Sequence, residues 1–280
     1  SYGTPDAGGI YAEGCSGLEI RNCNLDVYAI QWNPDLGADG FSTYGIMLTD
    51  CETGTLGLVI DGVIINSVIG GPGENGDFHV TPNGGDGGDA IGVELTNCRE
   101  LQLRDITVLN VESGPGGSGC FRSGGHGGNG GNAFGMLIYQ CEYLQIENCF
   151  VQSVQAGSGS NGIYDHYDGG DGGHAVAYRL EQCELIDAET LIVNHIVGGN
   201  GGATIQGDKS GNGGDASGIY IIGSLVTSLS NGLITNLYGG AGNTTNDGSS
   251  QIGNGGDASG VTVISTICEL FNTTVSDCMG

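Results

Sequence analysis

The sequence predicts an all-β fold, a right-handed parallel β-helix (β-solenoid) of about seven three-stranded coils with an adjoining layer of stacked polyglycine-II-type helices. Three observations lead to this prediction. An internal repeat runs through the chain, each repeat holds short runs of alternating apolar residues, and glycine-rich stretches follow a period of three. We therefore treat residues 1–280 as a single domain of stacked repeats.

The repeat is marked by a short phrase that opens with glycine (alanine in one copy) and continues with alternating apolar residues. It starts near residues 9, 45, 92, 135, 177, 218 and 260, so successive copies lie 36 to 47 residues apart. Self-similarity at a period of about 20–50 residues is typical of stacked architectures, in which each repeat buries its apolar face against its neighbours.

Each repeat contains three short runs in which every second residue is apolar. In the third repeat these runs carry Val93 and Leu95, then Leu101 and Leu103, then Ile106 and Val108. A period of two indicates strands with one buried face, and polar corners separate the runs. Coiling three such strands per repeat predicts three parallel sheets around a filled core.

Cysteine recurs six residues after the repeat start, at Cys15, Cys51, Cys98, Cys141 and Cys183. Neighbouring coils would hold these Cα atoms about 4.8 Å apart with parallel Cβ vectors, which fits disulfide geometry poorly. We expect a stack of buried thiols. The alternative is a set of disulfides across the core, for which the candidate pairs are Cys15–Cys23, Cys141–Cys149 and Cys268–Cys278.

Glycine-rich excursions fill the second half of most repeats, with one outgoing and one returning leg. The returning leg that starts at Gly84 reads Gly-Gly-Asp-Gly-Gly-Asp-Ala, and related legs follow in later repeats. Polyglycine-II-type helices have three residues per turn, and only glycine fits at their close contacts. The third residue is then displayed outward, as Asp, Asn or His. We expect either a ladder of amides that caps the backbone or a cation site at these positions.

Composition excludes several partners. The chain holds 32 Asp+Glu but only 6 Lys+Arg, for a formal net charge of −26, so we expect neither nucleic acid nor an anionic membrane as partner. No apolar run is long enough to insert into a membrane, and no export signal is evident. We expect no enzyme and no catalytic residues, because no basic residue shares a repeat position with an acidic cluster, although Arg104 and Asp105 could supply such a pair.

Two resemblances follow from these motifs. The leg from Gly84 to Gly92 resembles the nonapeptide of the repeats-in-toxin calcium β-roll, although it occurs once per repeat and not in tandem. That resemblance implies calcium as a cofactor, whereas otherwise we expect none. The implied calcium ligands are Asp86, Asp89, Asp171, Asp215 and Asp257.

The whole chain resembles right-handed β-helix surface proteins, including pectin-lyase-like and polymorphic-membrane-protein-like β-solenoid adhesins. The resemblance covers all seven repeats and implies the fold. It also suggests an extracellular or cell-surface protein. Sequons at Asn243 and Asn272 are compatible with glycosylation there.

Both ends of the sequence read as open coils in complementary phase. We therefore expect an extracellular structural protein whose copies stack head to tail into a filament or surface layer. The alternative is a viral or bacterial adhesin or shaft module that binds surface glycans through the excursion tips, in or beside which lie His79, His126 and His166. The residues expected to make the self-assembly contact are Asp6, Gly9, Ile10, Tyr11, Val261, Val263, Val275 and Cys278.

Overall fold

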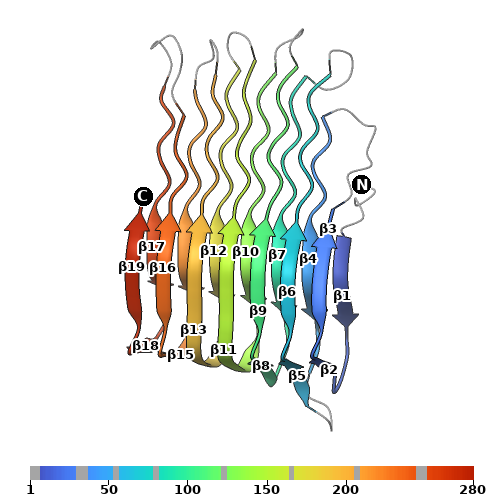
Figure 1. Cartoon of the computed structure of the whole chain (residues 1–280), viewed down its shortest axis with the longest axis vertical. Helices are drawn as coiled ribbons and strands as arrows, with labels where there is room; N and C mark the ends of the chain where they lie inside the picture. Colours follow the sequence, from blue (N-terminus) through green and yellow to red (C-terminus); the bar gives the residue numbers. More distant parts are fainter. Residues whose placement is uncertain are drawn as a thin grey trace.

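The computed structural model describes residues 7–29, 37–52, 57–77, 82–120, 125–163, 167–204, 209–243 and 251–280. All regular elements in these segments are β-strands, and every strand pairing between them is parallel. Figure 1 shows the strands stacked side by side, with wavy glycine-rich segments rising above the strands from one side of the stack. The all-β prediction and its parallel pairing are confirmed.

The first sheet contains the strand that opens each repeat. Its order along the stack equals the order in sequence, and each strand pairs in register with its counterpart one repeat later, as in Ile10↔Ile46 and Ile46↔Val93. Its strands are β1 (Ala7–Glu13), β4 (Thr43–Thr49), β7 (Ala90–Thr96), β10 (Ala133–Tyr139), β12 (Ala175–Glu181), β14 (Ala216–Ile222) and β17 (Ala258–Ile264).

The second sheet contains the remaining twelve strands. They are β2 (Glu19–Arg21), β3 (Asn24–Tyr28), β5 (Leu58–Asp61), β6 (Ile64–Ile69), β8 (Leu101–Arg104), β9 (Thr107–Glu112), β11 (Glu142–Gln155), β13 (Glu184–Val197), β15 (Leu225–Ser230), β16 (Leu233–Tyr238), β18 (Cys268–Phe271) and β19 (Thr274–Met279).

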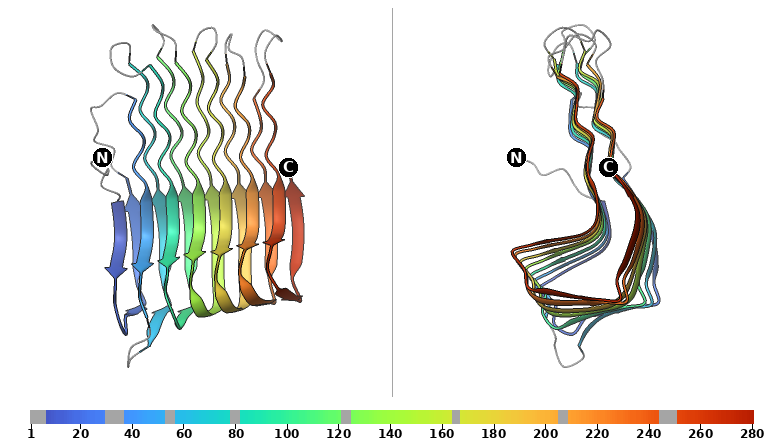
Figure 2. Two further views of the ribbon diagram at one scale, coloured as in Figure 1. Left: turned by 180° about the vertical axis from the view of Figure 1, so that it is seen from behind. Right: turned by 90° about the vertical axis from the view of Figure 1, so that its left-hand side faces the viewer.

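Our expectation of three separate sheets is corrected here. The second and third runs of two repeats are joined into the 14-residue strands β11 and β13, which pass through the corner without a break and merge the two faces into one sheet. The strand path also does not close into a ring. In the end-on view it stays open on the side where the glycine-rich segments leave (Figure 2).

The space between the two sheets is filled by apolar side chains, which form columns that run along the stack. One column contains Ile46, Val93, Met136 and Ile219, none of which is exposed to solvent. Burying each such side chain stabilises the fold by about 1.5–3 kcal/mol. Because partners in a column come from successive repeats, each repeat buries its apolar face mainly against its two neighbours.

Two corners per repeat are made by residues in the left-handed backbone region. Small polar residues and glycine tolerate this conformation best, and most of these positions carry them. The first corner uses Gly14, Asp50, Asn97, Gln140, Gln182, Gly223 and Ser265, and the second uses Asn22, Gly62, Asp105, Asn148, Thr190, Asn231 and Asn272.

The glycine-rich segments form two layers of legs, one outgoing and one returning, above the sheets (Figure 2). In the returning leg of residues 84–90, every backbone N–H has an acceptor. Gly87 N–H donates to the carbonyl of Asn129 in the next returning leg, and Gly88 N–H donates across the layers to the carbonyl of Gly71. Asp86 N–H donates to the Asp39 side chain. The legs are therefore ordered by hydrogen bonds between repeats.

These hydrogen bonds bring the legs too close together for side chains. A Cβ added to Gly114 would lie 1.8 Å from the carbonyl oxygen of Gly71, and one added to Gly214 would lie 1.9 Å from that of Gly173. The third residue of each triplet points away from the contact, which explains why only that position varies.

All ten cysteines are free thiols, so the expected thiol stack is confirmed and no disulfide crosses the core. The column is linked by hydrogen bonds, such as that from Cys98 N–H to Cys141 Sγ at 3.3 Å. Ser224 continues it by accepting the N–H of Cys183 at 3.2 Å. Burial raises the pKa of the Cys149 thiol to about 12 and that of Cys183 to about 11.

We predict that Gly114→Ala destabilises the protein by at least about 3 kcal/mol, because its methyl group would overlap backbone atoms that cannot move away. The matched control is Gly255→Ala, whose Cβ would have its nearest neighbour at 3.7 Å. Thermal unfolding followed by circular dichroism measures both. Equal melting temperatures for the two variants would contradict the close packing of the legs.

We also predict that six cysteines resist alkylation in the native protein at pH 8, because their side chains are buried out of reach of the reagent. These are Cys51, Cys98, Cys120, Cys141, Cys149 and Cys183. Cys278 is exposed and should react first. Peptide mass spectrometry after iodoacetamide treatment, with urea-unfolded protein as control, reads out each site. Rapid labelling of Cys141 in the native protein would contradict the burial of the cysteine column.

Candidate assembly surfaces and grooves

The displayed side chains of the returning legs form two continuous hydrogen-bonded ladders. In ladder 1 the side-chain oxygen of one repeat accepts the backbone N–H of the equivalent residue in the next, as from Asn129 N–H to Asp86 Oδ1 at 2.7 Å. It continues from Asp171 to Asn129 at 2.8 Å and from Asn212 to Asp171 at 2.7 Å. Asn254 N–H donates to Asn212 Oδ1 at 3.0 Å.

Ladder 2 follows the residue just before each opening strand. Asp89 Oδ1 accepts Asn132 N–H at 2.6 Å, and Asn132 Oδ1 accepts His174 N–H at 2.9 Å. His174 Nδ1 accepts Asp215 N–H at 3.0 Å, and Asp215 Oδ1 accepts Asp257 N–H at 2.9 Å. His174 thus uses Nδ1 as the acceptor where the other members of the ladder use Oδ1.

Both ladders have the same direction, which makes the two ends of the stack chemically different. Every acceptor side chain faces the next repeat along the sequence. At the last repeat, Asn254 Oδ1 and Asp257 Oδ1 receive no N–H from any residue that the structure describes. The C-terminal end of the stack thus presents acceptors.

The last repeat also exposes side chains that are buried at the same position one repeat earlier. Leu229 is 1% exposed, whereas Leu270, its partner in the next strand, is 47% exposed. Ile234 is fully buried, whereas its partner Val275 is 44% exposed. The end of the stack is therefore a cross-section of the apolar core, which is unusual for a free protein surface.

The expected self-assembly residues lie at the two ends of the stack. Val261 is partly buried, and Val263, Val275 and Cys278 are exposed at the C-terminal end. At the opposite end Ile10 is partly buried against the core, and Tyr11 is 55% exposed. Gly9 there packs against Gly45, and Asp6 lies outside the described residues. Whether the ends meet in solution stays a prediction.

The expected calcium ligands serve as ladder members. Asp86, Asp89, Asp171 and Asp215 each use Oδ1 to accept a backbone N–H from the next repeat. Burial raises the pKa of the Asp89 carboxyl, and the hydrogen bonds from Asn132 oppose that shift. Within the described segments, no three His, Cys, Asp or Glu side chains are grouped so that they could hold a metal ion. Calcium binding stays a prediction.

Both sequon asparagines use their side-chain nitrogen in hydrogen bonds. Asn272 Nδ2 donates to Asn231 Oδ1 at 3.3 Å, and Asn243 Nδ2 donates to the carbonyl of Gly201 at 3.2 Å. A glycan on either nitrogen would have to replace that contact.

The arginines in the described segments lie beside carboxylates on the outer faces. Arg99 donates to Glu142, and Arg179 lies 2.9 Å from Glu181. Arg104 lies 3.6 Å from Glu147 in the neighbouring strand, so it pairs across the sheet and not with Asp105. The expectation that the protein is not an enzyme stays a prediction.

The tips of the excursions carry the alternative glycan contacts expected from the sequence. Most of these residues, including His79 and His166, lie outside the described residues. His126 is described, and its ring lies edge-on to Tyr167 with centroids 5.2 Å apart. The tip hypothesis therefore stays a prediction. The described part of the chain contains no helix that is long and apolar enough to span a membrane.

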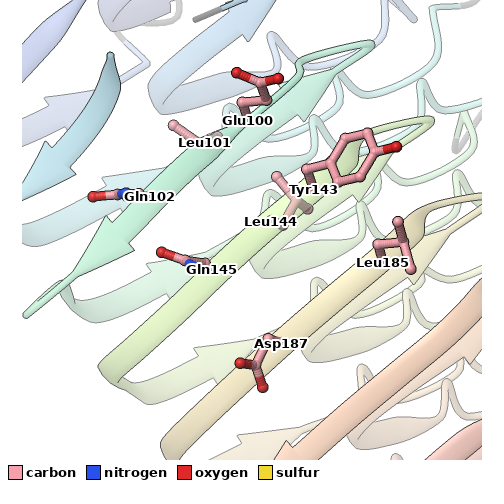
Figure 3. Close-up of a pocket in the computed structure, with 8 residues that line it drawn as sticks. All are labelled: Glu100, Leu101, Gln102, Tyr143, Leu144, Gln145, Leu185 and Asp187. Carbon is pink, nitrogen blue, oxygen red and sulfur yellow. The ribbon is translucent and has the colours of Figure 1, made fainter. Parts of the chain in front are cut away.

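Shallow grooves lie on the outer faces of the sheets. A groove of about 380 Å³ crosses β8, β11 and β13 between Tyr143 and Leu185 on one side and Gln102, Gln145 and Asp187 on the other (Figure 3). The second, of about 310 Å³, lies between the first sheet and ladder 2, where Arg179 is placed against the rings of Phe134 and Tyr220.

Sequence reasoning identified the ladder positions but missed the direction of the ladders and both grooves. The spacing of Asn and Asp was visible, whereas the donor and acceptor roles depend on backbone orientation. The sequence did contain a signal for the first groove: Tyr143 stands at a repeat position that Gly17 and Gly57 occupy in earlier repeats, so a bulky residue there is unexpected. Comparison with known proteins adds no relative: no family model, curated protein or solved structure matches the chain.

We predict that Asn129→Leu destabilises the protein by about 1 kcal/mol, because Asp171 N–H would lose its acceptor inside the leg layer. Asn129→Asp is the matched control, since Asp supplies the same acceptor at Asp86 and Asp171. Thermal unfolding gives the stability, and hydrogen exchange reports on the Asp171 amide. Unchanged exchange at Asp171 in the leucine variant would contradict the ladder.

Proposed function

We propose that the chain is an extracellular structural protein that self-assembles head to tail into a filament or surface layer. The observation that carries this proposal is the last repeat. Its core-facing residues are exposed, while the same columns are buried throughout the inner repeats. A second copy placed on this end would bury them in the way that each inner repeat buries its neighbour.

The proposal includes the finer architecture. We take the repeats to be turns of a right-handed β-solenoid, because connections between parallel strands of one sheet are right-handed in nearly all cases. We take the legs to be polyglycine-II-type helices. Their period of three and their hydrogen bonds in three directions, to both neighbouring repeats and to the other layer, support this. The ordered legs would then form a fin along one side of a filament.

Extending the observed register defines the proposed junction. Pairing of β17 with β1 of the next copy places Val261 on Ile10, continuing the column Ile10, Ile46, Val93 and so on to Val261. In the second sheet, the same extension places Leu270 on Ile20 and Val275 on Leu25. The contacting residues in all three pairs are apolar. Such a heterologous contact does not close and so propagates.

Charge and chemistry are compatible with this role. A net charge of −26 keeps the sides of separate assemblies apart, and salt would screen repulsion between copies as they dock. Six of the ten thiols are buried and so shielded from oxidants, whereas Cys278 is exposed. No catalytic step is required of the protein.

Negative-stain electron microscopy and sedimentation of the purified chain test the proposal. We expect long unbranched fibres whose formation accelerates with added salt. Discrete monomers at every protein and salt concentration would contradict it.

The sharper variant is Val275→Asp, which places a carboxylate in the proposed junction while leaving the isolated subunit folded, because Val275 is already 44% exposed. Burial of an unpaired charge should raise the critical concentration for assembly at least about 100-fold. Leu225→Asp is the matched control, since Leu225 is 54% exposed but faces outward from an inner strand. Equal assembly of both variants would contradict end-to-end stacking.

A further inference from the structure

The groove across β8, β11 and β13 has one largely apolar wall and one polar wall. Tyr143 and Leu185 form the apolar part of the first wall and are 54% and 44% exposed, and Glu100 continues the same row. Gln102, Gln145 and Asp187 form the polar wall and lie directly beside one another, because Gln145 pairs in register with both of the others. Figure 3 shows the two rows on either side of the groove.

The backbone at the apolar wall adopts a conformation that its residues disfavour. Tyr143 has φ of 56° and Leu185 has φ of 52°, whereas the equivalent positions of the first two repeats are Gly17 and Gly57. Glu100 has φ of 54° at the same position of the third repeat, so the left-handed corner belongs to the fold, and the unusual feature is the choice of bulky apolar residues at it. Since both side chains project into solvent, packing within the chain does not account for them.

The polar wall has uncommitted hydrogen-bonding groups. Among the described residues, the side-chain amides of Gln102 and Gln145 have no hydrogen-bond partner, unlike the surface amide of Gln140, which donates to Gln182 at 3.0 Å. Each free amide offers two donors and an acceptor, and Asp187 offers further acceptors. This set suits a ligand that is rich in hydroxyl groups.

The negative charge of the surface limits the class of ligand further. Glu100 and Asp187 border the groove, and the chain as a whole carries −26, so polyanions would be repelled. A flat ring face, hydroxyl-matching amides and an open groove of about 380 Å³ that runs across the strands fit an extended neutral chain of sugars.

We propose that this groove binds a neutral oligosaccharide or polysaccharide that lies along the stack axis. The Tyr143 ring stacks on the apolar face of one sugar, and the amides of Gln102 and Gln145 bind its hydroxyl groups and those of the next. The site is on the second sheet, away from the excursion tips, and does not depend on head-to-tail assembly.

The test titrates the full chain with cellohexaose and mannohexaose as neutral probes and hexagalacturonate as an anionic one. The side-chain amide signals of Gln102 and Gln145 in nuclear magnetic resonance spectra give a local readout. We expect at least one neutral probe to shift both signals and the anionic probe to shift neither.

Tyr143→Gly separates binding from stability. Glycine suits the left-handed backbone there, so the melting temperature should not fall, while affinity for the neutral probe should fall at least tenfold. Tyr143→Phe should retain binding, as should the control Tyr220→Ala on the first sheet. The proposal is overturned if no neutral probe shifts the amides or if Tyr143→Gly binds as well as the wild type. It is also overturned if Tyr143→Gly weakens side-by-side contact between copies of the chain while its affinity for the neutral probe stays unchanged.

Discussion

The hydrogen-bonding distance between neighbouring repeats controls the rest of this structure. Parallel strands lie about 4.8 Å apart, and the glycine legs above them must keep the same spacing because each leg continues from a strand. At that spacing a Cβ on Gly114 would lie 1.8 Å from the carbonyl oxygen of Gly71 in the outgoing leg of the previous repeat. Glycine is therefore required by geometry at two of every three leg positions, and the third position becomes the only place for chemistry.

The same constraint explains why displayed residues are so often Asn or Asp. With two N–H groups of each triplet bonded to backbone carbonyls, the third needs an acceptor in the previous repeat. A short side chain with an oxygen at the right distance supplies it, as Asp86 does for Asn129. The ladder gives the stack a direction, so its two ends differ chemically. The assembly that we propose would use the same pattern of hydrogen bonds that stabilises the stack.

Much of this could be predicted from sequence because repeats reveal equivalent positions. The strands, the thiol column from Cys51 to Cys183 and the leg positions all followed from spacing alone. Three features did not. The polar residues at one corner predicted a break between two strands. Strands β11 and β13 nevertheless run through that corner, because Asn148 and Thr190 adopt a left-handed conformation without ending the strand pairing. The open side of the strand path and the groove beside Tyr143 depend on side-chain and corner geometry that alternation does not encode.

The most direct test of the account is a cryo-electron microscopy reconstruction of fibres grown from the purified chain. If the last repeat of one copy continues into the first of the next, strand spacing should stay near 4.8 Å through the junction. The density at that point should then show Val275 packed on Leu25. Fibres in which the subunits meet through the legs or the outer faces, with Leu270 still facing solvent, would contradict it.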